Sequence, residues 1–120
     1  MAIPSGSGTE VLKRVFIASQ GEAEGTLITG VANHIYTIIS ILAMEKGGFS
    51  DSKFYMYIDA NAAGTDVYML DSVAVPSQTL FVFNDKFVLT GTDKLHCKGS
   101  SAGSAATYDV WCSYIDQDWT

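Results

Sequence analysis

Short runs of apolar and polar residues, separated by turn-forming residues, follow one another along this chain. The run Glu10–Ser19 (EVLKRVFIAS) carries apolar side chains at both sets of alternating positions, which is typical of a strand partly covered on its second face. The most apolar run, Asn33–Glu45 (NHIYTIISILAME), places β-branched isoleucines on one face and is therefore predicted to be a strand. Good helix formers follow in its second half, so a helix from about Ile38 to Lys46 stays as the alternative.

Seven further runs satisfy the same criteria for strands. They are Gly25–Val31, Ser52–Asp59, Asp66–Asp71, Gln78–Phe83, Lys86–Thr90, Leu95–Lys98 and Tyr108–Ile115. The signal of Gly25–Val31 is weak, so about eight strands are expected. Regular spacing without a long helical pattern predicts an all-β chain, folded as an antiparallel β-sandwich of jelly-roll or immunoglobulin-like type.

The two ends of the chain differ from this pattern. Residues 1–9 have no periodicity and cannot bury enough apolar area to order themselves, so we expect an N-terminal arm followed by one sandwich domain at residues 10–120. Beyond Ile115 the chain is expected to leave the sandwich, which makes Asp116–Thr120 a contact element. Trp119 within it is expected either to pack on its own domain or to insert into a neighbour.

Composition narrows the classes of partner. Charged residues make up 17% of the 120 residues, below the usual ~25%. This indicates either a surface covered by partner subunits or a surface rich in Ser, Thr and Gly. The net charge is −6 and the seven cations are scattered, so no nucleic-acid binding is expected. The longest apolar run, Ile35–Met44, is too short to span a bilayer, and no signal peptide precedes it.

Reactive side chains do not form a known catalytic or metal-binding pattern. The two histidines, His34 and His96, and the two cysteines, Cys97 and Cys112, lack the spacing of a zinc site. Cys112 lies in mid-strand, where nothing lowers a thiol pKa. We therefore expect no enzyme activity, no cofactor and no metal. Both cysteines are expected to be buried apolar groups in a reducing compartment, with a disulfide between them as the less favoured alternative.

Three stretches carry a resemblance to a known group of proteins. They are the opening MAIPSGSGTEVLKR, the strand-turn-strand FNDKFVLTGTDKLHCK and the ending CSYIDQDW. Together they resemble small virion structural proteins of tailed bacteriophages, in which a single jelly-roll-like β-sandwich carries a similar head and hairpin. This chain departs from the hairpin pattern through Thr92, which is inserted between Gly91 and Asp93, and Gln20–Gly64 contains no matching motif.

The resemblance implies a capsid decoration, or cement, protein. Such a protein sits on the outside of the phage head as a homo-oligomer, with a trimer favoured, and binds neighbouring major capsid subunits. It would be synthesised in the bacterial host cytoplasm and end up in the virion. The alternative is a tail, neck or fibre component with a receptor- or glycan-binding role, for which Tyr55, Tyr57 and Tyr68 would supply an aromatic face if they are exposed. The favoured expectation for these three tyrosines is a packed aromatic face of the sheet.

Contacts with partner subunits are expected within Met1–Arg14 and Tyr114–Thr120, where an arm and an aromatic anchor would bind. The candidate contact residues are Ile3, Pro4, Val11, Arg14, Tyr114, Asp118 and Trp119.

Overall fold

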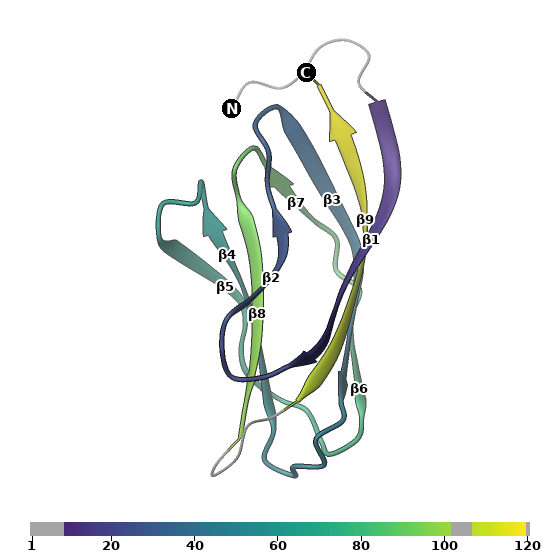
Figure 1. The fold of residues 1–120 in the computed structure, drawn as a ribbon, viewed down its shortest axis with the longest axis vertical. Coiled ribbons are helices and arrows are strands. Elements are labelled where there is room, and N and C mark those ends of the chain that lie inside the picture. The colour runs from purple at the N-terminus through teal and green to yellow at the C-terminus, as the bar shows by residue number, and fades with distance from the viewer. Residues whose placement is uncertain (1–8, 102–106, 120) are drawn as a thin grey trace.

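A computed structural model of the chain describes residues 9–101 and 107–119. These residues form two antiparallel sheets that pack face to face (Figure 1). The strands are β1 (Thr9–Gln20), β2 (Gly25–Thr29), β3 (His34–Glu45), β4 (Lys53–Ala60), β5 (Thr65–Ala74), β6 (Leu80–Phe83), β7 (Phe87–Thr90), β8 (Lys94–Ser100) and β9 (Tyr108–Asp118). The predicted all-β, jelly-roll-like sandwich is confirmed, with nine strands in place of about eight.

The strand order explains how distant parts of the sequence meet. The five-stranded sheet has the order β1-β9-β3-β6, and β7 pairs with the half of β3 that β6 leaves open. The four-stranded sheet has the order β2-β8-β4-β5. β1 and β5 are therefore edge strands, whereas β9 and β3 lie inside the larger sheet (Figure 1). The described residues include no helix that is long and apolar enough to span a membrane.

β3 is a strand throughout, so the helix predicted as the alternative from about Ile38 is wrong. β9 pairs with β3 along one side, and β6 and β7 pair with it along the other. These ladders override the local helix propensity. A β-bulge between Ile38 and Ser40 then shifts the alternation. Tyr36 and Ile38 point into the core before the bulge, and Ile41 and Ala43 do so after it.

The core lies between the two sheets. Its largest fully buried apolar side chains include Phe54, Met56 and Leu95 from the four-stranded sheet. Cys97 on β8 and Cys112 on β9 are both free, fully buried thiols on opposite sheets. The less favoured alternative, a disulfide between Cys97 and Cys112, is therefore wrong. Burial raises the pKa of both thiols to about 12, which leaves them protonated and unreactive near neutral pH.

We expect both cysteines to resist alkylation as long as the protein is folded. Maleimide should add to neither Cys97 nor Cys112 in the native state, and should add to both after denaturation, because the thiolate is the reactive form and both side chains are fully buried. Intact-mass spectrometry before and after denaturation measures this directly. Rapid modification of the native protein would contradict the buried placement.

Candidate protein-binding surface

One row of apolar side chains crosses the outward face of the five-stranded sheet. Phe16 on β1 lies opposite Trp111 on β9, and Trp111 lies opposite Leu42 on β3. Leu42 in turn lies opposite Val82 on β6. Because directly opposed residues of antiparallel strands share a face, these four side chains form a continuous row across four strands.

The same alternation places further apolar residues on this side of the sheet. The "apolar face" consists of Leu12, Phe16, Leu42, Met44, Leu80, Val82, Val88, Trp111 and Ile115. Leu12 is 73% exposed and Trp111 43% exposed, although both are large apolar side chains. Single exposed apolar residues are ordinary on protein surfaces, but a contiguous group of them marks a surface that binds something.

An aromatic stack rises at the centre of the apolar face. The rings of Phe16 and Trp111 are stacked, with their centroids 5.7 Å apart and their planes 14° apart. The guanidinium carbon of Arg14 lies 5.3 Å from the Phe16 centroid and 5.1 Å from that of Trp111. Both distances suit a cation–π interaction. Arg14 is one of the predicted contact residues, and that it contacts a partner stays a prediction.

Two open hollows lie on either side of Trp111. One, of about 350 Å³, is lined by Phe16, Ile17, Ala18, Leu42, Met44, Leu80, Asp109, Val110 and Trp111. The other, of about 510 Å³, is lined by Leu12, Lys13, Arg14, Ile39, Ser40, Trp111 and Ser113. Trp111 lines both, so its indole forms part of the wall between them. The apolar face is therefore a ridge flanked by two hollows.

The outward side of the four-stranded sheet has a different character. Tyr57 is only 3% exposed there, because Tyr68 and His96 pack on its ring and its hydroxyl donates a hydrogen bond to Glu24. Of the two alternatives for Tyr55, Tyr57 and Tyr68, an exposed face or a packed aromatic face of the sheet, Tyr57 therefore fits the second. The local sequence pattern does not predict the burial of Tyr57, since Glu24 lies in a loop 33 residues away.

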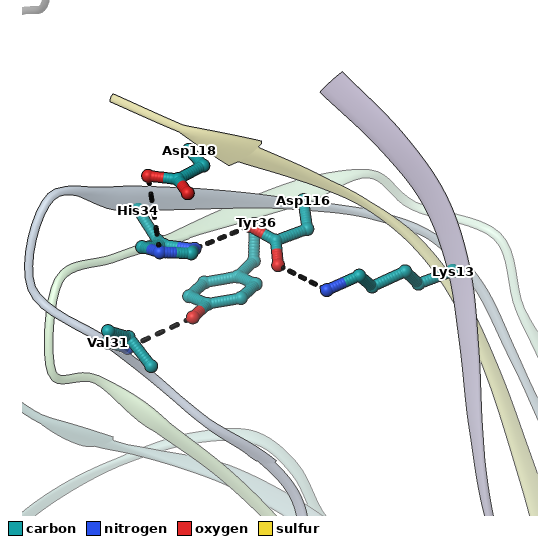
Figure 2. A network of polar contacts seen from close by, with 6 residues as sticks. All are labelled: Lys13, Val31, His34, Tyr36, Asp116 and Asp118. Carbon is teal, nitrogen blue, oxygen red and sulfur yellow. Dashed lines mark hydrogen bonds and ion pairs between the residues drawn. The ribbon is translucent and has the colours of Figure 1, made fainter. Parts of the chain in front are cut away.

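Charged side chains from three neighbouring strands meet at one end of the five-stranded sheet. Figure 2 shows Asp116 of β9 between Lys13 of β1 and His34 of β3. Lys13 Nζ donates to Asp116 Oδ2 at 2.9 Å, and His34 Nδ1 lies 2.8 Å from Asp116 Oδ1. His34 Nε2 also lies 3.5 Å from Asp118 Oδ1.

Asp116 is the buried centre of this cluster, with 6% of its surface exposed. Burial acts to raise the pKa of its carboxyl group. The hydrogen bonds from Lys13 and His34 outweigh burial and hold the pKa below its ordinary value. The carboxylate is therefore charged at neutral pH, and it ties the ends of three strands together.

The prediction that the chain leaves the sandwich after Ile115 is wrong. β9 continues to Asp118, which pairs with Thr9 on one side and with His34 on the other. The next residue, Trp119, donates its backbone N–H to the Asn33 carbonyl at 3.0 Å. Asp116, which was expected in a contact element beyond the sandwich, faces inward to Lys13 and His34, which lie far away in the sequence.

The remaining predicted contact residues lie at this same end of the sheet. Val11 pairs with Asp116, and the ring of Tyr114 packs against Tyr36. The indole of Trp119 is half-buried, and its N–H has no acceptor among the described residues. Ile3 and Pro4 lie outside the described residues. The structure therefore separates Arg14, on the apolar face, from Val11, Tyr114, Asp118 and Trp119.

Sequence reasoning missed Phe16 and Trp111 as surface residues. One signal was present, since Glu10–Ser19 carries apolar side chains on both faces. The pairing of β1 with β9 was needed to show that the second face joins Trp111. Among the described residues no group of three or more His, Cys, Asp or Glu side chains could hold a metal ion.

Comparison with known proteins gives the fold and no family. No protein-family model matches the chain, and no curated protein sequence matches it. A chain from Bacillus endospore appendages, which form a family of disulfide-linked pili, matches with a TM-score of 0.55 and 17% identity. That match covers 100% of this chain and 97% of the other.

Two structures from infectious bursal disease virus match as well. The Gx strain structure has a TM-score of 0.59, 14% identity and 92% coverage of this chain, against 32% of the viral chain. The VP2 subviral particle has the same TM-score, 12% identity and 92% coverage, against 33% of its chain. This chain thus spans about a third of the viral chains. At these identities the comparisons establish a β-sandwich fold that occurs in a pilus protein and in a viral coat protein.

Proposed function

We propose that this protein is a structural subunit that functions by binding other protein subunits. The observation that carries the proposal is the apolar face, where Leu12, Phe16 and Trp111 stand exposed beside two hollows. Covering apolar surface stabilises an assembly by roughly 25 cal/mol per Å². Sandwiches of this fold in a pilus protein and in a viral coat protein support the same class of role.

Within that class we favour a capsid decoration protein on the outside of a phage head. In this role the protein binds neighbouring major capsid subunits and reinforces their contacts. The resemblance of both chain ends and the final hairpin to phage virion proteins supports this choice. Attachment at several points makes weak contacts collectively strong, so each single contact can be small. Nucleic acid and membrane are not partners in this proposal.

The structure changes which residues would make the attachment. Trp119 is half-buried and its backbone is bonded to Asn33, so it is poorly placed as an anchor. Trp111, with Arg14 stacked on it, is the better placed aromatic side chain for a contact between subunits.

Residues 1–8 stay in the proposal as an arm that orders on the partner, whereas Thr9, which was expected in the arm, pairs with Asp118 as the first residue of β1. β1, which begins at Thr9, fixes the point from which this arm would leave the sandwich.

Gradient fractionation of the particles that carry the protein tests the proposal. We expect the chain to sediment with virion heads, in a copy number comparable to that of the major shell protein. A variant lacking residues 1–8 should fold normally and occupy fewer sites, because the arm supplies one of several attachments. Absence of the chain from particles would count against the decoration role. Full occupancy by the truncated variant would count against the arm.

A tail, neck or fibre component is the second candidate. The correspondence with a pilus chain over the full length favours it, as do the edge strands β1 and β5. A low copy number per particle, or filaments that react with antibody to the chain, would favour this candidate. Disulfides between the subunits of such a fibre would not form at Cys97 or Cys112, because both cysteines are buried inside one subunit. The burial of Tyr57 weakens a glycan-binding version.

A further inference from the structure

We propose that the apolar face is covered by the same face of a second copy of this chain. Two copies would then pack sheet against sheet about a two-fold axis. The inference rests on the proposed function and deepens it: it assigns the apolar face to the contact between copies of this chain, and it leaves attachment to a shell to the N-terminal arm and to the surface outside this face. Four observations carry it: the character of the other faces, the size of the face, its shape and its charge.

The first observation is that the outward side of the other sheet is polar. Its central strands present residues paired across the sheet as Tyr55 with Lys98 and Asp59 with Lys94. Sheets that stack face to face exclude water between apolar side chains about 10 Å apart. A charged surface cannot fulfil that condition. Of the two sheet faces that a second copy offers, the apolar one is therefore the face that complements this one.

The second observation is the size of the face. β1 and β3 each contain 12 residues, so the sheet is about 40 Å long at ~3.3 Å per residue. Four strand positions at ~4.8 Å give a width of about 19 Å. The outward side of the sheet thus spans roughly 750 Å² in projection, which is of the same order as the ~800 Å² of accessible surface that each partner contributes to a stable interface. A second copy has a sheet of the same dimensions.

The third observation is that the ridge and the hollows can complement each other. Trp111 lines both hollows, so the stack of Phe16 and Trp111 stands between them. In a two-fold pair the ridge of each copy enters a hollow of the other, so the same contact occurs once on each side of the axis. Trp and Arg are also the residue types that contribute most at interface centres, and Arg14 lies over both rings.

The fourth observation concerns charge, since two chains of net charge −6 repel each other. Apart from Arg14, the charged residues at outward positions of β1 and β9 are Glu10 and Asp109, near opposite ends of the sheet. Asp109 is paired with Lys46 at 2.8 Å. Asp109 also lines the smaller hollow beside Trp111, but its pairing with Lys46 offsets its charge, so repulsion between two copies is reduced where the proposed contact is closest.

Analytical ultracentrifugation over a range of concentrations tests the pairing. The wild-type protein should sediment as a species of twice the chain mass of 12.9 kDa. Trp111→Asp and Leu12→Asp should each weaken dimerisation by about 30-fold or more, since a charge would enter the centre of an apolar contact. Val67→Asp is the matched control, because Val67 is 53% exposed and lies on β5 of the other sheet.

Circular dichroism and thermal unfolding show whether each variant is folded. Leu12, Val67 and Trp111 are exposed, so we expect substitutions there to leave the fold intact. A wild-type protein that is monomeric at every concentration would overturn the inference, as would dimers of unchanged affinity in both face variants. A trimer or larger ring would overturn the two-fold arrangement. These outcomes are independent of particle binding: a monomer that still decorates heads would leave the proposed function intact. A dimer absent from particles would instead count against that function.

Discussion

Glu45→Ala is expected to lower the free energy of unfolding by about 2–4 kcal/mol. The carboxylate of Glu45 is fully buried at the end of β3. Its Oε1 accepts the backbone N–H of Gly47 at 2.7 Å, and its Oε2 accepts those of Gly48 at 3.2 Å and Gln78 at 2.9 Å. Truncation leaves three donors without their acceptor. Water can replace part of the loss, because these three residues are exposed.

Urea unfolding followed by circular dichroism measures this effect, and Glu22→Ala provides the control. Glu22 is an exposed loop residue, so its removal should change stability by less than about 0.5 kcal/mol. Glu45→Gln should fall between the two, since one acceptor oxygen remains. Equal stability of Glu45→Ala and Glu22→Ala would show that the three bonds contribute nothing. The result matters for the apolar face, because Glu45 fixes the segment that leads into β6 and Leu80.

Most of the secondary structure can be predicted from local sequence pattern. Each of the nine strands overlaps a run that was predicted from alternation and from turn residues, including the weak run at β2. Such patterns are read over a few residues, and no distant partner is needed to see them. Gly47-Gly48 end β3, and Pro76 precedes β6, as residues of those types should.

Features that depend on pairing between distant strands could not be predicted in this way. The bulge between Ile38 and Ser40 reverses which residues of β3 face the core, although isoleucines lie on both sides of it, at 38, 39 and 41. Trp111 can be assigned to an exposed apolar row only once β1 places Phe16 beside it. Local pattern places Asp116 beyond the sandwich, because Lys13 and His34, which contact it, lie 103 and 82 residues away.

Asp116→Asn is expected to destabilise the protein by about 2 kcal/mol near pH 7, and by much less near pH 3. The substitution keeps the size of the side chain but removes the buried negative charge that Lys13 and His34 contact. Breaking a buried ion pair costs about 3–5 kcal/mol, and the cost is smaller here because the Lys13 side chain is 46% exposed. Lys13 can therefore turn toward water.

The direction of the pH dependence follows from the lowered pKa of Asp116. In the folded wild-type protein this pKa lies below its ordinary value of 3.8, so the unfolded chain takes up a proton first as the pH falls. The stabilising contribution of Asp116 is thus present above about pH 4 and is lost as the pH falls through the folded-state pKa. Asn has no proton to gain, so the difference between wild type and variant should shrink in acid.

Urea unfolding of both proteins near pH 7 and near pH 3 measures that difference, and Asp109→Asn is the control. Hydrogen bonds from Lys46 and from the Ser19 backbone lower the pKa of Asp109 too, but the side chains of the Asp109–Lys46 pair are 48% and 38% exposed. Exposed pairs contribute less than about 1 kcal/mol, so Asp109→Asn should have the smaller effect. A destabilisation by Asp116→Asn that is equally large at both pH values would mean that shape and packing, not the charge of Asp116, hold the three strand ends together.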